Sequence, residues 1–362
     1  MTLTLFCTAC RQPAPLTAWR CPACGGVLDT RLPTFQPDAI VRHEASLWRY
    51  AASLPIERTV SLGEGFTPLV ALPHTPDPRL MVKLEYAAPT GSFKDRGTVM
   101  TINALLQAGV HDVVEDSSGN AGASLAAYAA AAGMHARIFT PAHAAEGKKR
   151  QMRIFGADLV EVPGPRSAAT EACLRAAEES VYASHAWSPL PLLGFMTAAW
   201  ELWEQLGDAP AAVVCPVGQG GLFLGLWRGF LALRTAGCIT RMPRLYAVQS
   251  TACAPITTAW YLKEPDPIAV EEGETIAEGI RIAHPVRGRD VLSAIRSSGG
   301  AAFAVSDEAT RAAHRWFAKR GLFVEPTSAV VGVPLEEICE HTREDGAIVL
   351  MLTGSGLKYG LS

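Results

Sequence analysis

Short apolar runs alternate with helical patterns from about residue 60 onward, and this alternation limits the folds open to the chain more than any other feature. Short links join these elements in strand–helix–strand order, so neighbouring strands are expected to pair in parallel through right-handed crossovers. The sequence therefore predicts an α/β fold with mostly parallel sheets. The predicted strands cover 113–114, 136–139, 159–162, 212–215, 245–248 and 348–351, and the predicted helices cover 121–132, 145–155, 167–180 and 306–321.

Chain length and local composition predict more than one structural unit. The 362 residues are enough for two domains with a sizeable core. Residues 1–30 are rich in Pro and Cys and contain little that can form a core, so we expect a small separate module there. A connector at 31–60, with a helix-like piece at 46–50, leads to the main region at 61–362.

Charge and hydropathy argue against several partners. The formal net charge is -3 and no basic run is present, which disfavours nucleic acid and anionic membranes as partners. No stretch reaches the ~18 consecutive apolar residues of a transmembrane helix. The first residues lack the charged start and apolar run of a signal peptide, so we expect a cytoplasmic protein.

Four of the nine cysteines form two CxxC pairs with ten residues between them. Each pair can place two thiolates on one ion, and Gly25 suits the positive φ of such turns. Four thiolates favour tetrahedral Zn²⁺, and a site with no open position favours a structural role. The scattered remaining cysteines fit a reducing compartment. The predicted zinc ligands are Cys7, Cys10, Cys21 and Cys24.

Lys94 lies between small and turn residues, where a loop meets a predicted helix, in the segment 89–97. A lysine amine placed in this way can form an imine with the aldehyde of pyridoxal phosphate (PLP), and later move protons. A surface lysine in a polar loop is the alternative for this residue alone.

Two further segments combine small residues with a strand-to-helix turn. At 117–122, backbone N–H groups at a helix start can bind a carboxylate, although an ordinary capped helix fits equally well. At 218–222, three glycines in four residues can surround one phosphate. Phe223 stands where a dinucleotide-binding motif needs its last glycine, so a single phosphate fits better than NAD or ATP.

Taken in order, six motifs resemble the fold type II PLP enzymes, the tryptophan synthase β-like group, and within it the threonine synthases. The resemblance covers roughly residues 58–362 and implies two doubly wound three-layer domains, with 90–185 approximately the smaller subdomain. The motifs are Leu62–Leu69, the Gly-Ser-Phe-Lys-Asp-Arg-Gly run at 91–97, Ser-Ser-Gly-Asn at 117–120, Gly-Gln-Gly-Gly at 218–221, Glu325–Ala329 and Thr-Gly-Ser-Gly-Leu-Lys at 353–358.

The resemblance also implies roles for single residues. Lys94 would be the Schiff-base lysine, and Thr353 would face the pyridine nitrogen, where a neutral hydroxyl leaves that nitrogen largely unprotonated. A simple glycine turn is the alternative at 353–356. The implied cofactor contacts are Lys94, Phe93, Asn120, Gly218, Gln219, Gly220, Gly221, Leu222 and Thr353. The implied substrate contacts are Ser117, Ser118, Gly119, Asn120, Ala121 and His185, and we add Trp187 and Gln249 as further candidates.

The segment 184–197 departs from the threonine synthase pattern. Pro191 stands where the family places an arginine for the phosphate of O-phosphohomoserine, and Met196 stands where a lysine is common. A phosphate dianion needs charge-assisted donors, which apolar side chains do not provide. The segment therefore predicts an apolar pocket wall and a different substrate. The Gly279–Ile280 motif also resembles the dehydratases.

The predicted reaction starts with α-proton removal by Lys94 and continues with loss or replacement of a β- or γ-substituent. The first candidate is a threonine synthase-like carbon–oxygen lyase. A serine/threonine-type ammonia-lyase (dehydratase) or a β-replacement enzyme is the alternative, and a non-catalytic PLP-fold binding protein is the third. The expected partner is a small amino-acid substrate, and family analogy suggests a homodimer.

Overall fold

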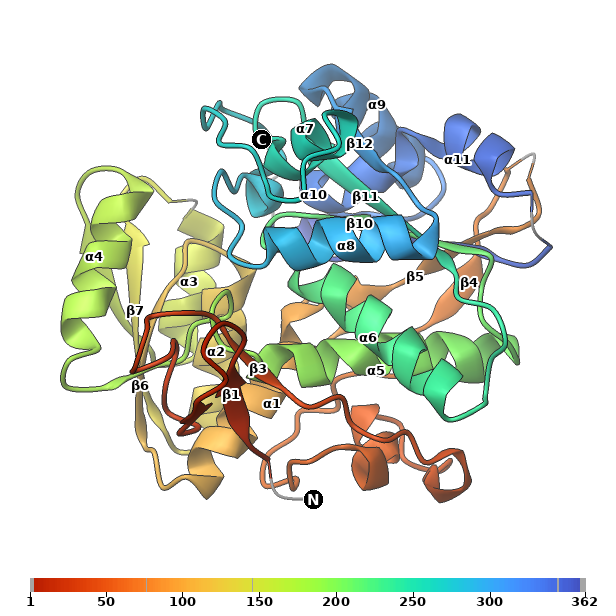
Figure 1. Ribbon diagram of the computed structural model, residues 1–362. Helices are drawn as coiled ribbons and strands as arrows, with labels where there is room; N and C mark the ends of the chain where they lie inside the picture. Colours follow the sequence, from red (N-terminus) through yellow and green to blue (C-terminus); the bar gives the residue numbers. More distant parts are fainter. Residues whose placement is uncertain (1–2, 76, 145, 344, 359–362) are drawn as a thin grey trace. The chain divides into compact units, whose positions relative to one another are not determined.

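The computed structural model describes residues 3–75, 77–144, 146–343 and 345–358 (Figure 1). Residue 145, in the predicted helix 145–155, and residues 359–362, at the end of the predicted main region, lie outside the described residues. The chain contacts divide it into two compact units. Unit 1 comprises residues 1–65 and 88–194, and unit 2 comprises residues 66–87 and 195–362.

Unit 1 contains a four-stranded sheet in the order β8-β7-β6-β9, and every strand pair in it is parallel. Each strand contains a short apolar stretch, such as Val113–Val114 in β6, as the sequence pattern predicts. The strands are β6 (Asp112–Asp116), β7 (His135–Pro141), β8 (Asp158–Val162) and β9 (Val181–Tyr182). The helices are α1 (Lys94–Gln107), α2 (Asn120–Ala131), α3 (Glu146–Ile154) and α4 (Arg166–Ala176).

Helices cover both faces of this sheet. Ile138 and Phe139 are consecutive residues of β7, so their side chains point to opposite faces. Ile138 packs with Ala123 of α2 and Met152 of α3. Phe139 packs with Cys173 of α4. Unit 1 is therefore a doubly wound three-layer structure, as predicted.

The first residues of unit 1 form a small antiparallel sheet in the order β2-β1-β3. Its strands are β1 (Leu5–Cys7), β2 (Pro13–Ala14) and β3 (Leu28–Thr30). Two 3-10 helices follow, η1 (Pro37–Ala39) and η2 (Leu47–Ser53). The Ser46 hydroxyl accepts a hydrogen bond from the Trp48 N–H at 3.2 Å, which explains why η2 begins where the helix-like piece was predicted.

Unit 2 contains a six-stranded sheet in the order β12-β11-β10-β13-β5-β4, parallel except for the edge strand β4. The strands are β4 (Leu69–Ala71), β5 (Leu80–Lys83), β10 (Ala212–Pro216), β11 (Arg244–Ser250), β12 (Ala302–Val305) and β13 (Ile348–Met351). The main helices are α6 (Gly221–Thr235), α7 (Pro255–Tyr261), α8 (Gly288–Ser298), α9 (Asp307–Ala318), α10 (Pro326–Ala329) and α11 (Leu335–His341).

Four short 3-10 helices complete unit 2, and one helix continues from unit 1 into it. The 3-10 helices are η3 (Glu85–Ala87), η4 (Glu278–Ile280), η5 (Val330–Gly332) and η6 (Gly356–Lys358). The helix α5 (Leu190–Leu206) begins in unit 1 and ends in unit 2.

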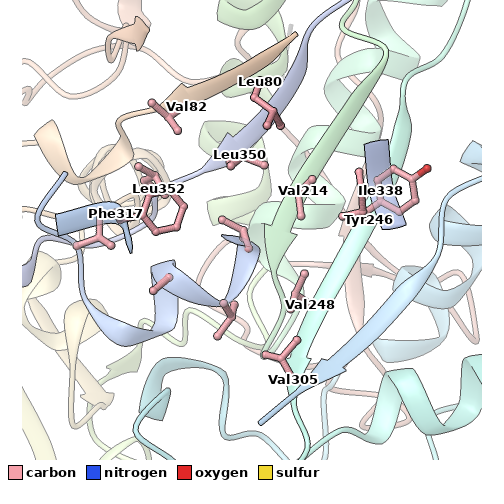
Figure 2. Close-up of a cluster of buried hydrophobic side chains, with 14 of the residues drawn as sticks. Leu80, Val82, Val214, Tyr246, Val248, Val305, Phe317, Ile338, Leu350 and Leu352 are labelled. Atoms are coloured by element: carbon pink, nitrogen blue, oxygen red, sulfur yellow. The ribbon is translucent and has the colours of Figure 1, made fainter. Parts of the chain in front are cut away.

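A single apolar cluster fills one side of the unit 2 sheet (Figure 2). Val214, Val248 and Leu350 from the sheet pack there with Phe317 of α9 and Ile338 of α11. The neighbouring strand residues Val213, Leu245 and Val349 are equally buried and point to the opposite face, because strand side chains alternate. Helices α6 and α8 contact β10 and β11. Unit 2 thus also has helices on both faces.

The predicted strands and helices are all present, with ends shifted by a few residues. Ser306 caps α9 as predicted, since its hydroxyl accepts from the Ala309 N–H at 3.2 Å. The predicted ranges did not include several other elements, among them β4, β5, β12, α5 and α8. Among the described residues, no helix is long and apolar enough to cross a bilayer.

Candidate active site

Lys94 is the first residue of α1, and a network around the next residue fixes the turn that leads to it. The buried Asp95 carboxylate accepts hydrogen bonds from the Thr90 N–H at 2.7 Å, the Thr90 hydroxyl at 2.6 Å and the Ser124 hydroxyl of α2 at 2.6 Å. The Lys94 ammonium nitrogen lies 4.5 Å from the centroid of the Phe93 ring. The predicted Phe93–Lys94 pair is thus held at a helix start by a neighbouring helix.

The Ser92 hydroxyl is buried beside this turn and has no hydrogen-bond partner among the described residues. A buried hydroxyl without a partner costs free energy. A ligand group bound here would satisfy it. The loop that carries Lys94 therefore contains an unused polar atom that fits a site for a polar ligand.

The loop 117–119 joins β6 to α2, whose first residue is Asn120. The Ser117 hydroxyl accepts from the Gly122 N–H at 2.9 Å and from the Gly119 N–H at 3.3 Å. A Cβ on Gly122 would lie 2.7 Å from Met152 Cε and 3.1 Å from Ser117 Cβ, so the packing around this glycine is tight. The Ser117 side chain thus caps the helix, and the first turn of an α-helix is also where backbone N–H groups can bind an anion. The capped-helix interpretation and the anion-binding interpretation are compatible.

Two cationic side chains that the sequence did not predict as site residues lie beside this loop. Lys148 of α3 is buried, and a Cβ on Gly119 would lie 3.9 Å from its Nζ. Arg166, the first residue of α4, donates from Nη1 to the Ser118 hydroxyl at 3.3 Å. Both helices follow parallel strands, so their first turns lie at the same sheet edge as loop 117–119. That topology is the signal that could have found them.

His185 follows β9 and pairs with a buried carboxylate on the neighbouring strand β6. Its Nδ1 lies 2.5 Å from Oε1 of Glu115, whose side chain is 2% exposed. Two residues further, the Trp187 ring contacts the Trp19 ring edge-on, with 5.3 Å between the centroids. The sequence predicted His185 as a substrate contact, but Glu115 was not among the candidates, because 70 residues separate the two.

Pro191 lies in the first turn of α5 and is buried with its neighbours Leu190 and Leu192. Met196 is fully buried further along α5. Proline is well suited to the first turn of a helix, where its missing N–H costs nothing. The apolar character predicted for this segment thus serves at least one structural purpose, the start of α5.

In unit 2, the glycine loop 218–220 joins β10 to α6. Gly220 has φ +84°, and a Cβ there would lie 2.4 Å from Val291 Cγ2. A Cβ on Gly218 would lie 3.0 Å from the Gly279 carbonyl oxygen. The Gln219 side chain accepts from the Val286 N–H at 3.1 Å, which fixes the loop. Backbone N–H groups at the start of the 15-residue α6 remain for an anion.

Thr353 follows β13 in unit 2 and lies against a second hydroxyl. Its Oγ1 is 3.0 Å from Ser328 Oγ, and both residues are almost fully buried. The Ser328 hydroxyl also accepts from the Gly354 N–H at 2.8 Å. A neutral pair of hydroxyls, with no carboxylate in it, therefore occupies the position predicted to face a pyridine nitrogen.

Gln249 has a structural role in unit 2. Its amide oxygen accepts from the Ile256 and Thr257 N–H groups at 2.9 and 3.0 Å, at the start of α7. Its amide nitrogen donates to the Val217 carbonyl at 3.1 Å. These hydrogen bonds fix the fully buried Gln249 side chain within the fold rather than toward a ligand.

Comparison with known proteins gives one family for this arrangement. A family model described as "Pyridoxal-phosphate dependent enzyme" matches residues 60–354. The chain belongs to this family. The match spans both units and includes Lys94, the loop 117–119, the glycine loop and Thr353.

Similar proteins narrow the family further. A threonine synthase from Methanocaldococcus jannaschii is 37% identical over 330 residues, covering 88% of this chain and 82% of that one. A threonine synthase from Methanosarcina acetivorans is 33% identical over 356 residues, covering 94% and 88%. The structure of a fungal L-serine ammonia-lyase from Rhizomucor miehei matches with a TM-score of 0.70 and 25% identity, covering 80% and 93%. The protein is a threonine synthase-like, PLP-dependent lyase.

The described residues of this PLP enzyme fit its cofactor in each unit. Unit 1 offers Lys94 at a fixed helix start. Unit 2 offers a glycine loop at the start of a long helix, where backbone N–H groups can bind a phosphate, and a side chain on Gly220 of this loop would clash with Val291. It also offers the neutral hydroxyl of Thr353.

The four N-terminal cysteines of this PLP enzyme lie together, with their ligand atoms within 4.8 Å of one another. The Cys7–Cys24 and Cys10–Cys21 sulfur distances are 3.4 and 3.6 Å. Tetrahedral Zn²⁺ with Zn–S bonds of about 2.3 Å separates its sulfurs by about 3.8 Å. The Cys10 N–H lies 3.5 Å from the Cys7 sulfur, and this hydrogen bond lowers the pKa of the Cys7 thiol to about 6. The cluster therefore fits a Cys₄ metal site.

Proposed function

We propose that Lys94 binds PLP and then removes the α-proton of a small amino-acid substrate. The network of Asp95 with Thr90 and Ser124 carries this assignment, because it holds the lysine at the start of α1. PLP supplies an electron sink for the pair left at Cα. The freed Lys94 amine accepts the proton and holds it for a later step.

Other residues of the chain bind and orient the reactants in this proposal. The N–H groups of Gly218–Leu222 bind the cofactor phosphate, Thr353 meets the pyridine nitrogen, and Phe93 and Asn120 make further cofactor contacts. The loop Ser117–Ala121 binds the substrate α-carboxylate, with Lys148 and Arg166 supplying positive charge nearby. His185 contacts the substrate side chain.

Replacing Lys94 tests the assignment. Lys94→Ala should abolish both the visible absorbance of the bound cofactor and amino-acid turnover. Lys319→Ala, at an exposed lysine after α9, should keep both. Far-UV circular dichroism confirms that each variant folds. A Lys94→Ala protein that keeps colour and turnover would show that another group holds the cofactor.

A second candidate reaction is that of an ammonia-lyase or a β-replacement enzyme. The buried Pro191 and the absence of Lys and Arg from 184–197 favour it over a threonine synthase reaction on O-phosphohomoserine. Phosphate release from O-phosphohomoserine would support the threonine synthase reaction. Keto-acid formation from other amino acids would support the ammonia-lyase.

We further propose a structural Zn²⁺ on the four cysteines, a separate ribbon-like module at 1–30 with a connector at 31–60, and a cytoplasmic homodimer that binds neither nucleic acid nor membranes. The sulfur distances support the metal, and the near-neutral charge without a basic run supports the absence of polyanionic partners. Sedimentation equilibrium measures the oligomeric state.

A further inference from the structure

We infer that His185, oriented by Glu115, is the general acid that protonates a hydroxyl leaving group, so that the substrate is a hydroxy-amino acid. This inference rests on the proposed function of Lys94 and names the substrate class of the same site. Both residues lie in unit 1, and no sequence motif contains the two together.

The geometry of the pair fixes the imidazole. Glu115 Oε1 lies 2.5 Å from His185 Nδ1 and 3.4 Å from the His185 backbone nitrogen. A buried carboxylate at Nδ1 holds a proton on that nitrogen and sets the ring orientation. Among the described residues, none makes a hydrogen bond to Nε2 of this ring, whose side chain is 20% exposed. Nε2 is therefore the nitrogen that can exchange a proton with a ligand.

The neighbouring Asp116 does not compete for His185. Its carboxylate accepts from the Thr170 hydroxyl at 2.6 Å and from the Tyr182 hydroxyl, and it lies 3.8 Å from Arg166. Consecutive strand residues point to opposite faces, so Glu115 and Asp116 have separate partners. Glu115, and not Asp116, is therefore the carboxylate that pairs with the His185 imidazole.

The pair lies at the edge of the sheet where a ligand is expected. β9 and β6 are parallel neighbours, so His185 and the loop 117–119 both follow strand carboxyl ends. Ligands of open α/β sheets bind at this edge. The helix α5 that follows His185 packs against the turn of Lys94, since a Cβ on Gly194 would lie 1.7 Å from the Arg96 carbonyl oxygen.

The chemistry of leaving groups then selects the substrate. A phosphate ester leaves as a stable anion, since the second pKa of a phosphate is about 6. Hydroxide is a poor leaving group, because water is a very weak acid whose pKa lies far above neutral pH. A hydroxyl therefore needs a proton at the moment its carbon–oxygen bond breaks. The segment 184–197 contains no Lys or Arg to bind a phosphate, and its second residue is His185.

Two protein groups, Lys94 and His185, accept and donate the protons of this step. Lys94 takes the α-proton, and the pair of the Cα–H bond forms the Cα=Cβ bond. The pair of the Cβ–O bond goes to oxygen, which takes the Nε2 proton of protonated His185 and leaves as water. Hydrolysis of the released enamine by water gives a keto acid and ammonia.

The test compares a leaving group that needs a proton with one that does not. Purified holoenzyme is assayed with L-serine, L-threonine and β-chloro-L-alanine, whose chloride leaves unprotonated. His185→Asn should lower the ratio of kcat for the hydroxy-amino acid to kcat for β-chloro-L-alanine by ~10²–10⁴-fold. Glu115→Gln should lower the same ratio by less. The control is His135→Asn, which breaks another histidine–carboxylate pair, to Asp158 on the strand β8, and should leave the ratio unchanged.

Each outcome decides the question. An equal loss with both classes of substrate shows a structural role for His185 and overturns the inference. The same holds if neither activity changes, or if the wild-type enzyme processes the chloride or a phosphate ester but no hydroxy-amino acid. Failure of the proposed function is distinct, because it appears as cofactor absorbance that does not depend on Lys94.

Discussion

The hydroxyl oxygens of Ser328 and Thr353 lie 3.0 Å apart, on two segments that meet only through folding. Ser328 Oγ also accepts from the Gly354 N–H, so it holds the loop that follows β13. The hydrogen-bond partner of the buried Thr353 hydroxyl is thus a second, neutral hydroxyl. This neutrality separates the proposed cofactor partner from a carboxylate, which would hold a proton on a pyridine nitrogen.

Removal of the Thr353 hydroxyl should weaken PLP binding. Because a typical hydrogen bond contributes about 1 kcal/mol, Thr353→Ala should raise the Kd for PLP about fivefold. Thr353→Ser keeps the hydroxyl and should bind as the wild type does. Absorbance titration of the apoenzyme measures both. Equal weakening in the two variants would assign the effect to the lost methyl group instead.

The ion pair between Lys83 of β5 and Glu201 of α5 should stabilise unit 2. The pair is 2.8 Å long and neither side chain is exposed. Lys83→Met leaves a buried carboxylate without this ammonium, which should cost about 3–5 kcal/mol of unfolding free energy. Urea unfolding followed by circular dichroism measures the loss.

A surface pair provides the control for Lys83. Arg289 and Asp266 form a pair with side chains 69% and 51% exposed. Arg289→Met should therefore change the stability by less than about 1 kcal/mol. Equal effects of the two substitutions would show that burial does not determine how much the Lys83–Glu201 pair contributes to stability.

Zinc removal should affect stability and leave the chemistry intact. A Cys₄ site offers no open position for a substrate, so its metal has no direct catalytic role. We expect one zinc per chain by elemental analysis, and Cys21→Ser should lower both the zinc content and the thermal midpoint. The kcat of the folded enzyme should stay near that of the wild type. A kcat that follows zinc content at constant thermal midpoint would contradict this.

The Asp77–Arg79 pair should make stability depend on pH in acid. The Arg79 guanidinium lowers the pKa of Asp77 from 3.8 to about 2. A carboxyl with a lower pKa in the folded state stabilises it above the unfolded pKa, and this contribution disappears as the pH falls through the folded pKa. The stability difference between wild type and Asp77→Asn should therefore shrink between about pH 4 and pH 2, from at most about 1 kcal/mol. Urea unfolding at pH 7, 4 and 3 measures it.

Local sequence signals predicted most of the fold. Apolar runs such as 212–215 are buried on both faces, and such runs favour parallel strands regardless of distant contacts. Glycines such as Gly220 were also informative, because a positive φ and a close approach to Val291 exclude other residues. β5 was missed because its apolar run is only three residues long and ends at Lys83, a residue that becomes acceptable at a buried position through its pair with the distant Glu201.

Contacts between distant segments were harder to predict. The partner of His185 is 70 residues away, and neither residue belongs to a motif that names the other. Lys148 and Arg166 occur in helices without a recognisable motif, and only the strand order places their first turns beside the loop 117–119. The sequence thus located the loops between strand and helix at 117–119 and 218–220, but it did not identify the charged side chains that lie beside the loop 117–119.

Trp19 lies between the two cysteine pairs, and its ring contacts both Trp187 and Tyr182. The ribbon-like segment therefore supplies part of the surroundings of residues next to His185. If His185 contacts the substrate as proposed, a substitution in the first 30 residues can alter specificity without changing any active-site motif.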